Sequence, residues 1–154
     1  MFDLAVSQRE YVDFTPINED WSVYKLEDNT ILKTKAVVIK IVRTDTLNLS
    51  VNATNVVGVV PPPELVGTPN LTPVDPKTAE SSIEKPDMKF ETIHEDWNSY
   101  QLADDGTLQL KHLLVEVART SLHDERGDPV YRVYTQDIMR GVGMHKPTAE
   151  VLPK

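Results

Sequence analysis

Alternating apolar and polar residues along the chain predict short antiparallel strands rather than helices. From Trp21 to Leu26, and again from Trp97 to Leu102, the alternation indicates a strand with its tyrosine and leucine on one face and its tryptophan on the other. A tight turn should follow each strand. Asp104-Asp105-Gly106 is a hairpin signal because glycine adopts the positive φ of such turns, and Asn29 can take the same conformation at the matching place.

The next strand is long, and its alternation changes phase partway. The less polar face starts with Leu32, Thr34 and Ala36, and the apolar set then moves to odd-numbered residues. Because side chains alternate strictly in a strand, such a slip predicts a bulge or sharp bend that lets one strand serve two parts of a core. The predicted interior residues are Tyr24, Leu26, Val37, Ile39 and Ile41, with Tyr100, Leu102, Leu113, Val115 and Val117.

A third strand is predicted at residues 49 to 57 and at residues 131 to 139. The alternation breaks around Thr54-Asn55 and around Gln136-Asp137, which indicates a short turn before a last strand. Each set of strands is then a meander of three or four strands.

The two sets of strands belong to an internal repeat. Residues 14 to 44 align with residues 90 to 120 without a gap, and 12 of the 31 aligned positions are identical. Roughly two identities are expected by chance. We therefore expect an all-β fold, a tandem duplication of a small, strongly bent β-barrel or meander, SH3-like or Sm-like in shape.

The repeat also predicts the division of the chain. The first β unit is expected at residues 1–60, a proline-rich connector at residues 61–89, and the second β unit with a C-terminal tail at residues 90–154. Seven prolines lie between residues 61 and 86. Because proline cannot donate to a sheet ladder, we expect this connector to be extended.

Charge, cysteine content and the length of apolar runs limit the partners and the cellular location that we expect. The net charge is −8, divided as −2, −2 and −4 over the three segments, so no segment resembles a phosphate-binding surface. There is no cysteine, which excludes disulfides and thiolate chemistry. The first ten residues lack a basic leader, and no apolar run approaches the length of about 18 residues that a membrane span needs. We therefore expect a soluble, cytoplasmic protein.

The repeated Glu-Asp-Trp triplets are the strongest candidates for a binding site. Adjacent carboxylates beside an indole can bind a cation or a basic peptide. The competing hypothesis, which residue preferences favour, is that the acids cap turns and the tryptophans pack the core. Two shared arginines suit bidentate pairing with one of the shared acids, or else lie solvated at strand ends. The candidate residues are Glu19, Asp20, Trp21 and Arg43, with Glu95, Asp96, Trp97 and Arg119.

The sequence contains no pattern that predicts a metal or a catalytic centre. His94, His112, His123 and His145 match no zinc spacing. Residues 124 to 128 lack the downstream glutamate of a calcium loop and are predicted to form a polar hairpin turn. Phosphate-binding loops, nucleophile elbows and cysteine nucleophiles are missing, so we expect no catalytic residue, no metal and no cofactor.

These observations favour a non-enzymatic protein-interaction or structural module, acting through a protein surface or as an oligomer. One alternative is a nucleic-acid-binding small barrel, which needs Lys25, Lys33, Lys35 and Lys40 on one face. The predicted phase slip instead places Lys40 on the opposite side, so nucleic acid is not the expected partner. The second alternative is a hydrolase that uses a carboxylate pair between the two units.

Overall fold

The computed structural model describes residues 10–43, 49–103 and 105–142. Within them, strands dominate and form two antiparallel sheets, so the predicted all-β class is confirmed. Neither sheet closes into a barrel in this part of the chain. The predicted C-terminal tail after residue 142 and position 104 of the second turn lie outside the described residues.

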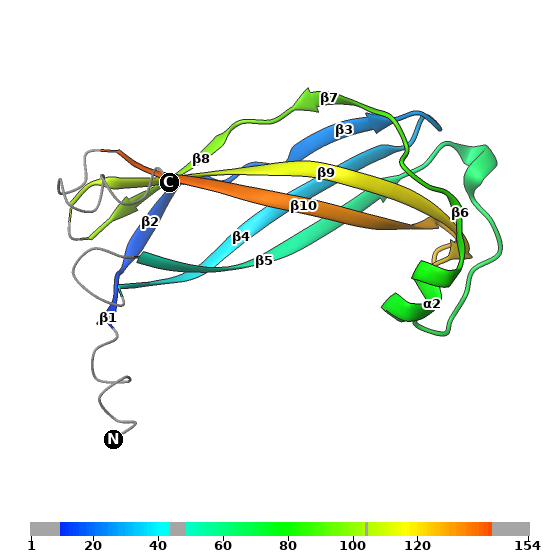
Figure 1. Cartoon of the computed structure of the whole chain (residues 1–154), viewed down its shortest axis with the longest axis horizontal. Coiled ribbons are helices and arrows are strands. Elements are labelled where there is room, and N and C mark those ends of the chain that lie inside the picture. The colour runs from blue at the N-terminus through cyan, green and yellow to red at the C-terminus, as the bar shows by residue number, and fades with distance from the viewer. Residues whose placement is uncertain (1–9, 44–48, 104, 143–154) are drawn as a thin grey trace, which may run out of the picture.

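Two five-stranded sheets, which we call sheet A and sheet B, make up the fold (Figure 1). Sheet A comprises β1 (Glu10–Tyr11), β3 (Ser22–Leu26), β4 (Ile31–Arg43), β5 (Leu49–Val60) and β7 (Phe90–His94). Sheet B comprises β2 (Phe14–Asn18), β6 (Ile83–Lys85), β8 (Trp97–Leu102), β9 (Thr107–His123) and β10 (Pro129–Val142). The paired strands β4 and β5, and β9 and β10, run along the length of the molecule and cross in Figure 1.

Each sheet takes one strand from the other half of the chain. Strand β2 pairs with β8, with Phe14 opposite Leu102, while β7 pairs with β3, with Phe90 opposite Leu26. Both pairings contain a register shift at the matching place. Strands from residues 1–60 therefore pair with strands from residues 90–154, and each sheet needs both ranges. The division into two units stays a prediction.

Both predicted hairpin turns are confirmed. The Leu26 N–H donates to the Thr30 carbonyl at 2.8 Å, and the Leu102 N–H donates to the Gly106 carbonyl at 3.1 Å. Asn29 has a φ of 71° and Gly106 a φ of 89°, which is the left-handed conformation that tight turns require. The turns join β3 to β4 and β8 to β9.

The long strands β4 and β9 change phase as predicted, but later than the sequence pattern suggested. The register of β4 shifts between Val38 and Lys40, and the register of β9 shifts so that one residue, Val115, has no cross-strand partner. The extra residues Ile39 and Val115 are 56% and 54% exposed. Their predicted interior position is wrong, because a bulged residue leaves the ladder and turns toward solvent.

The later bulge also corrects two further core predictions. The even-numbered residues of β4 before the bulge, from Leu32 to Val38, are buried, so Val37 lies on the outer face of sheet A. Leu113 lies on the outer face of sheet B for the same reason. The remaining predicted interior residues are buried, namely Tyr24, Leu26, Ile41, Tyr100, Leu102 and Val117.

Two hydrophobic clusters fill the space between the sheets. The first contains Val12, Ala36, Val38, Ile41, Tyr100, Leu102, Leu108 and Leu110. The second contains Tyr24, Leu26, Leu32, Met88, Leu114 and Val117. Strand β4 contributes Leu32 to one cluster and Ile41 to the other, so one bent strand serves two parts of the core. Both clusters combine residues from the two halves of the chain, so each half buries apolar area against the other.

The predicted turns in the third strands are wrong. Strand β5 runs unbroken through Thr54-Asn55, and β10 runs unbroken through Gln136-Asp137. Around these residues both faces of each strand are largely exposed, so burial on one face does not impose an alternating pattern there.

The connector is more structured than its prolines suggested. It contains a short 3-10 helix, η1 (Pro63–Leu65), a helix α2 (Pro76–Ser81), and β6, which pairs with β9. The Asp75 side chain caps α2 by accepting from the Thr78 N–H at 2.7 Å, with Pro76 at the first helical position, where proline is tolerated. The expectation of an extended connector is therefore wrong over these segments.

The connector also docks on the turn between β9 and β10. The Gly67 N–H donates to the Gly127 carbonyl at 2.8 Å, and the Asn70 N–H donates to the Asp124 carbonyl at 2.9 Å. Gly127 has a φ of 87°, and a Cβ atom there would lie 2.5 Å from the Gly67 carbonyl oxygen. The Asp124 carboxylate accepts from two backbone N–H groups of the same turn, which confirms the predicted polar hairpin.

Candidate functional site

The glutamates of the two Glu-Asp-Trp triplets lie where the two halves of the chain meet. Tyr100 donates its hydroxyl hydrogen to Glu19 at 2.7 Å, and Tyr24 donates to Glu95 in the matching arrangement. Glu19 also accepts from the Val38 N–H at 3.0 Å. Each glutamate therefore binds a buried tyrosine of the other half, and the two contacts lock the exchanged strands in place.

Burial defines the chemistry of these tyrosines. Burial first, and the hydrogen bond to Glu95 second, raise the pKa of Tyr24 to about 12. The pKa of Tyr100 is also raised, by burial and by Glu19. Both phenols therefore stay protonated near neutral pH and act as hydrogen-bond donors, whereas a nucleophile or a general base would need a lowered pKa.

The other members of the triplets face outward. Asp20 and Asp96 are exposed, and the Asp96 carboxylate lies 3.9 Å from Nε2 of His94. Trp21 is 36% exposed and Trp97 is half-buried, so the expectation that the tryptophans pack the core is wrong. They lie on the outer sheet faces because the tyrosine and leucine of the same strands take the inner face.

Each tryptophan has a lysine from the neighbouring strand over its ring. The ammonium of Lys35 lies 5.5 Å from the centre of the Trp21 ring, and that of Lys111 lies 5.8 Å from the Trp97 ring. Arg140 also stacks on Trp97, with its guanidinium carbon 3.9 Å from the ring centre. Cations over indole faces stabilise an exposed aromatic surface.

The two arginines that the repeats share, Arg43 and Arg119, lie at separate places in the fold. Arg119 pairs with Asp28 at 3.0 Å and with Glu84 at 2.9 Å. Asp28 also accepts from the Tyr131 hydroxyl at 2.7 Å. Burial alone would raise the pKa of Asp28, but hydrogen bonds from Tyr131, Thr30 and Arg119 hold it below its ordinary value. This network ties the first hairpin turn to sheet B, which is a structural role.

Arg43 ends β4, is half-buried, and lies opposite Glu10 of β1. The position that matches Asp28 in the second copy is residue 104, which is outside the described residues. The candidate residues are therefore not gathered into one site, because the triplets and the arginines occupy separate places in the fold.

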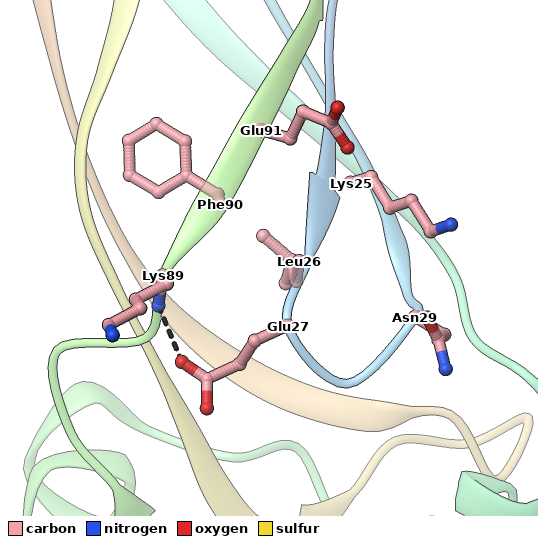
Figure 2. A pocket seen from close by; sticks show the side chains of 7 residues that line it. All are labelled: Lys25, Leu26, Glu27, Asn29, Lys89, Phe90 and Glu91. Carbon is pink, nitrogen blue, oxygen red and sulfur yellow. Dashed lines mark hydrogen bonds between the residues drawn. The ribbon is translucent and has the colours of Figure 1, made fainter.

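A shallow pocket of about 310 Å³ lies where the end of β3 pairs with the start of β7 (Figure 2). Its lining residues are Lys25, Leu26, Glu27, Asn29, Lys89, Phe90 and Glu91. The Glu27 carboxylate already accepts from the Lys89 N–H at 2.6 Å and pairs with Lys85 at 3.0 Å, and these contacts hold the pKa of Glu27 below its ordinary value. In Figure 2 the Lys25 ammonium and the Phe90 ring project to opposite sides. The pocket therefore lacks a convergent set of polar groups.

Two further pockets have a similar character. One of about 300 Å³ lies between the connector and the turn after β9, and one of about 240 Å³ lies beside β1. Glu19 and Glu95 line none of these three pockets. The carboxylates between the two halves are thus occupied with tyrosine and backbone donors, which is the opposite of what a carboxylate-dependent hydrolase needs.

Four lysines share the outer face of sheet A, and we call this surface the lysine face. Lys33 and Lys35 alternate with buried residues of β4, and Lys25 lies on the adjacent β3. Because the bulge at Ile39 adds one residue, Lys40 returns to the same outer face, with Ile41 buried behind it. The expected separation of Lys40 from Lys33 and Lys35 is therefore wrong.

The rest of the lysine face is almost free of acids. Lys25 lies opposite Glu91 of β7, and Lys40 lies 5.6 Å from the ring of the exposed Tyr11. The outward residues of the neighbouring β5 are all uncharged, namely Asn52, Thr54, Val56, Gly58 and Val60. In a chain of net charge −8, this face is a local positive region.

The described histidines, His94, His112 and His123, do not gather into a metal site. In the described ranges, no group of three or more His, Asp or Glu side chains is placed to hold a metal ion, and His145 lies outside them. His112 is buried between the sheets, and its Nδ1 lies 2.6 Å from Oδ1 of Asp137. This contact joins the neighbouring strands β9 and β10.

Comparisons with protein-family models, with curated proteins and with solved structures gave no match to this chain. No helix within the described residues is long and apolar enough to cross a membrane.

Sequence reasoning placed Tyr24 and Tyr100 in the interior but missed their hydrogen bonds to the glutamates, and it placed one lysine wrongly. Tyr24 aligns with Tyr100 in the repeat, and Glu19 aligns with Glu95. The presence of both residue types in both copies was the available signal for a reciprocal contact. The position of Lys40 depends on a bulge of one residue, which the alternation of β4 does not locate.

Proposed function

We propose that the protein is a non-enzymatic interaction module that binds an acidic partner protein through the lysine face. The observation that carries the proposal is the gathering of Lys25, Lys33, Lys35 and Lys40 on the outer face of sheet A in an otherwise acidic chain. Positive patches of this kind attract and orient acidic partners, and they raise association rates.

Support also comes from what surrounds the lysines. Trp21 and Tyr11 are exposed aromatic residues next to Lys35 and Lys40, and aromatic residues with cations are enriched at protein interfaces. The uncharged surface of β5 beside them supplies apolar contact area. A partner with an acidic, extended surface fits this combination.

A titration of the protein with a fluorescein-labelled oligoglutamate peptide tests the proposal. The variant Lys33→Glu with Lys40→Glu changes two exposed lysines of the lysine face. We expect it to bind the peptide roughly tenfold more weakly or worse, because it removes two attractive charges and adds two repulsive ones. Wild-type binding should also weaken as salt is raised.

The matched control changes two exposed lysines outside the lysine face, Lys77→Glu with Lys89→Glu, and so has the same net charge. It should bind the peptide like the wild type. Equal loss of binding in both double variants would mean that only overall charge matters, and absence of wild-type binding would remove the lysine face as the binding surface.

A second candidate is a single-stranded nucleic acid. The observation in its favour is that Lys40 joins Lys33 and Lys35 beside two exposed aromatic rings, since lysines and stacking rings are the usual parts of such surfaces. Against it, each ring already has a lysine over it, and the net charge of −8 repels a polyanion. We expect no binding to labelled single-stranded RNA tighter than roughly 10 μM at physiological salt. Submicromolar, salt-sensitive binding that Lys33→Glu abolishes would favour the second candidate.

We also infer that the chain arose by duplication of one unit. The inference rests on the twelve identities between the repeats and on the matching registers of the two exchanged strands. An SH3-like or Sm-like shape for the single unit is part of the same proposal, supported by the bulged, bent central strand.

A further inference from the structure

Strand β5 is an open edge of sheet A. It pairs with β4 on one side, and no strand in the described part of the chain pairs with its other side. An edge strand presents a row of backbone N–H and C=O groups that another strand can pair with. Most proteins protect such edges with charged residues, with proline, or by keeping the strand short.

The other described edge strands carry these protections, and β5 does not. Strands β1 and β6 have only two and three residues, and each contains a charged residue. Strand β10 contains Arg132, Asp137 and Arg140, β7 is short and contains Glu91, and β2 is short and contains a proline. Over its twelve residues, β5 contains no charged residue and no proline. It is therefore the one described edge that is long and lacks a barrier to pairing.

Exposed valines cluster at the end of β5. Val56 and Val60 lie on the outer face, because they pair with Lys35 and Ile31 of β4, while Val57 lies on the inner face. All three side chains are exposed. An additional strand along β5 would cover apolar side chains on both faces of the sheet, and cross-strand valine pairs stabilise such a pairing.

The sequence of this segment is symmetric. Residues 56 to 60 are Val-Val-Gly-Val-Val, which reads the same in both directions. We propose that a second copy of this chain pairs with β5 in antiparallel orientation, with the two-fold axis at Gly58. Val56 then faces Val60 of the partner subunit, and each inward valine faces an inward valine, so the side-chain phase of both sheets is kept.

The uncharged β5 edge explains where two copies meet, and the number of such edges explains why assembly stops at two. Each copy has a net charge of −8, so copies repel one another, and the uncharged β5 edge is the place where they meet without placing acids face to face. Pro61 and Pro62 follow Val60 and cannot donate, which limits the paired segment. Since each copy has one such edge among its described strands, the pairing closes as a dimer and does not extend into a fibre.

The dimer goes beyond the proposed function. A two-fold axis perpendicular to the sheet joins the two copies of sheet A into one continuous sheet, with both lysine faces on the same side. The dimer does not depend on the lysine face, so it is still expected if the protein does not bind the peptide.

Molar mass measured by light scattering over a range of concentrations tests the pairing. The chain has a mass of 17.4 kDa, and we expect a shift to twice this value with a dissociation constant on the order of 10 to 100 μM, as befits a small interface. Val60→Lys should weaken the dimer roughly tenfold or more, because the substitution occurs twice in the symmetric contact. The control Val115→Lys changes a valine of equal exposure, 54%, on a central strand, and should leave the dimer unchanged.

A cysteine variant gives an independent measurement. The chain has no cysteine, and a Cβ atom at Gly58 meets only the Lys33 Cβ, at 3.9 Å, so Gly58→Cys fits the fold. Under oxidation, Gly58→Cys should form a covalent dimer, whereas Val115→Cys should not. A monomer at all concentrations, a dimer that Val60→Lys leaves intact, or equal cross-linking of both cysteine variants would each overturn the proposal.

Discussion

The bulge in β4 predicts that two isoleucines, two positions apart on one strand, differ sharply in their contribution to stability. In a regular strand, Ile39 and Ile41 would share a face and cost about the same on truncation. Here Ile41 is 1% exposed and packs in the first hydrophobic cluster, whereas Ile39 is 56% exposed. The same substitution, isoleucine to alanine, therefore measures the phase of the strand directly.

The expected magnitudes follow from burial. Ile41→Ala removes buried methyl and methylene groups and leaves a cavity, so we expect a loss of about 2 to 5 kcal/mol in the free energy of unfolding. Ile39→Ala removes exposed groups, and we expect a loss within about 1 kcal/mol, which includes the lower strand propensity of alanine. In a chain of this size, 1 kcal/mol shifts the Tm by roughly 2 to 4 °C, so Ile41→Ala should lower the Tm by about 10 °C.

Equilibrium unfolding in urea, followed by tryptophan fluorescence at one protein concentration, measures the difference. The two variants should have the same m-value, so that the change in midpoint reports stability. Val117→Ala and Val115→Ala repeat the comparison in the second copy. Equal losses for Ile39→Ala and Ile41→Ala would refute the bulge and restore a regular strand.

Two further predictions follow from the exchanged strands and from the buried tyrosines. A fragment of residues 83–142 should form a symmetric dimer in which β7 of each copy pairs with β8 of the other, because no β3 is present to receive it, and a folded monomer by light scattering would contradict the reciprocal exchange. The folded pKa of Tyr24, about 12, lies above its ordinary value of 10.0, so its contribution to stability is present below pH 10 and is lost as the pH rises through 12. Tyrosinate absorbance and circular dichroism in one alkaline titration should show the buried tyrosines ionising together with unfolding, and ionisation of all five tyrosines near pH 10 in a folded protein would argue against their burial.

Local chemistry in the sequence was sufficient for strands β3 and β8 and for the turns that follow them. The alternation around Tyr24 and Tyr100 predicted β3 and β8, and the positive φ available to Asn29 and Gly106 predicted the turns that follow them. These features depend on neighbours within a few residues, so a single sequence contains the information that determines them.

The candidate site was less predictable, because its residues act across the chain. Glu19 was expected to cap a turn or bind a ligand, and it instead accepts from Tyr100 in the other half. Nothing in the alternation of residues states which half of the chain a strand pairs with. The exposed tryptophans follow instead from alternation, since the tyrosines and leucines of the same strands take the inner faces.

The sequence by itself determined the all-β class, the hairpins and the presence of a phase slip in each long strand. Only the tertiary structure decided where the slip falls, since a bulge at Ile39 and a bulge two residues earlier give similar patterns of apolar residues. That position decides whether Lys40 joins the lysine face. The tertiary structure also decided that β2 and β7 exchange sheets, because the burial of Phe14 and Phe90 depends on partners from the opposite half of the chain.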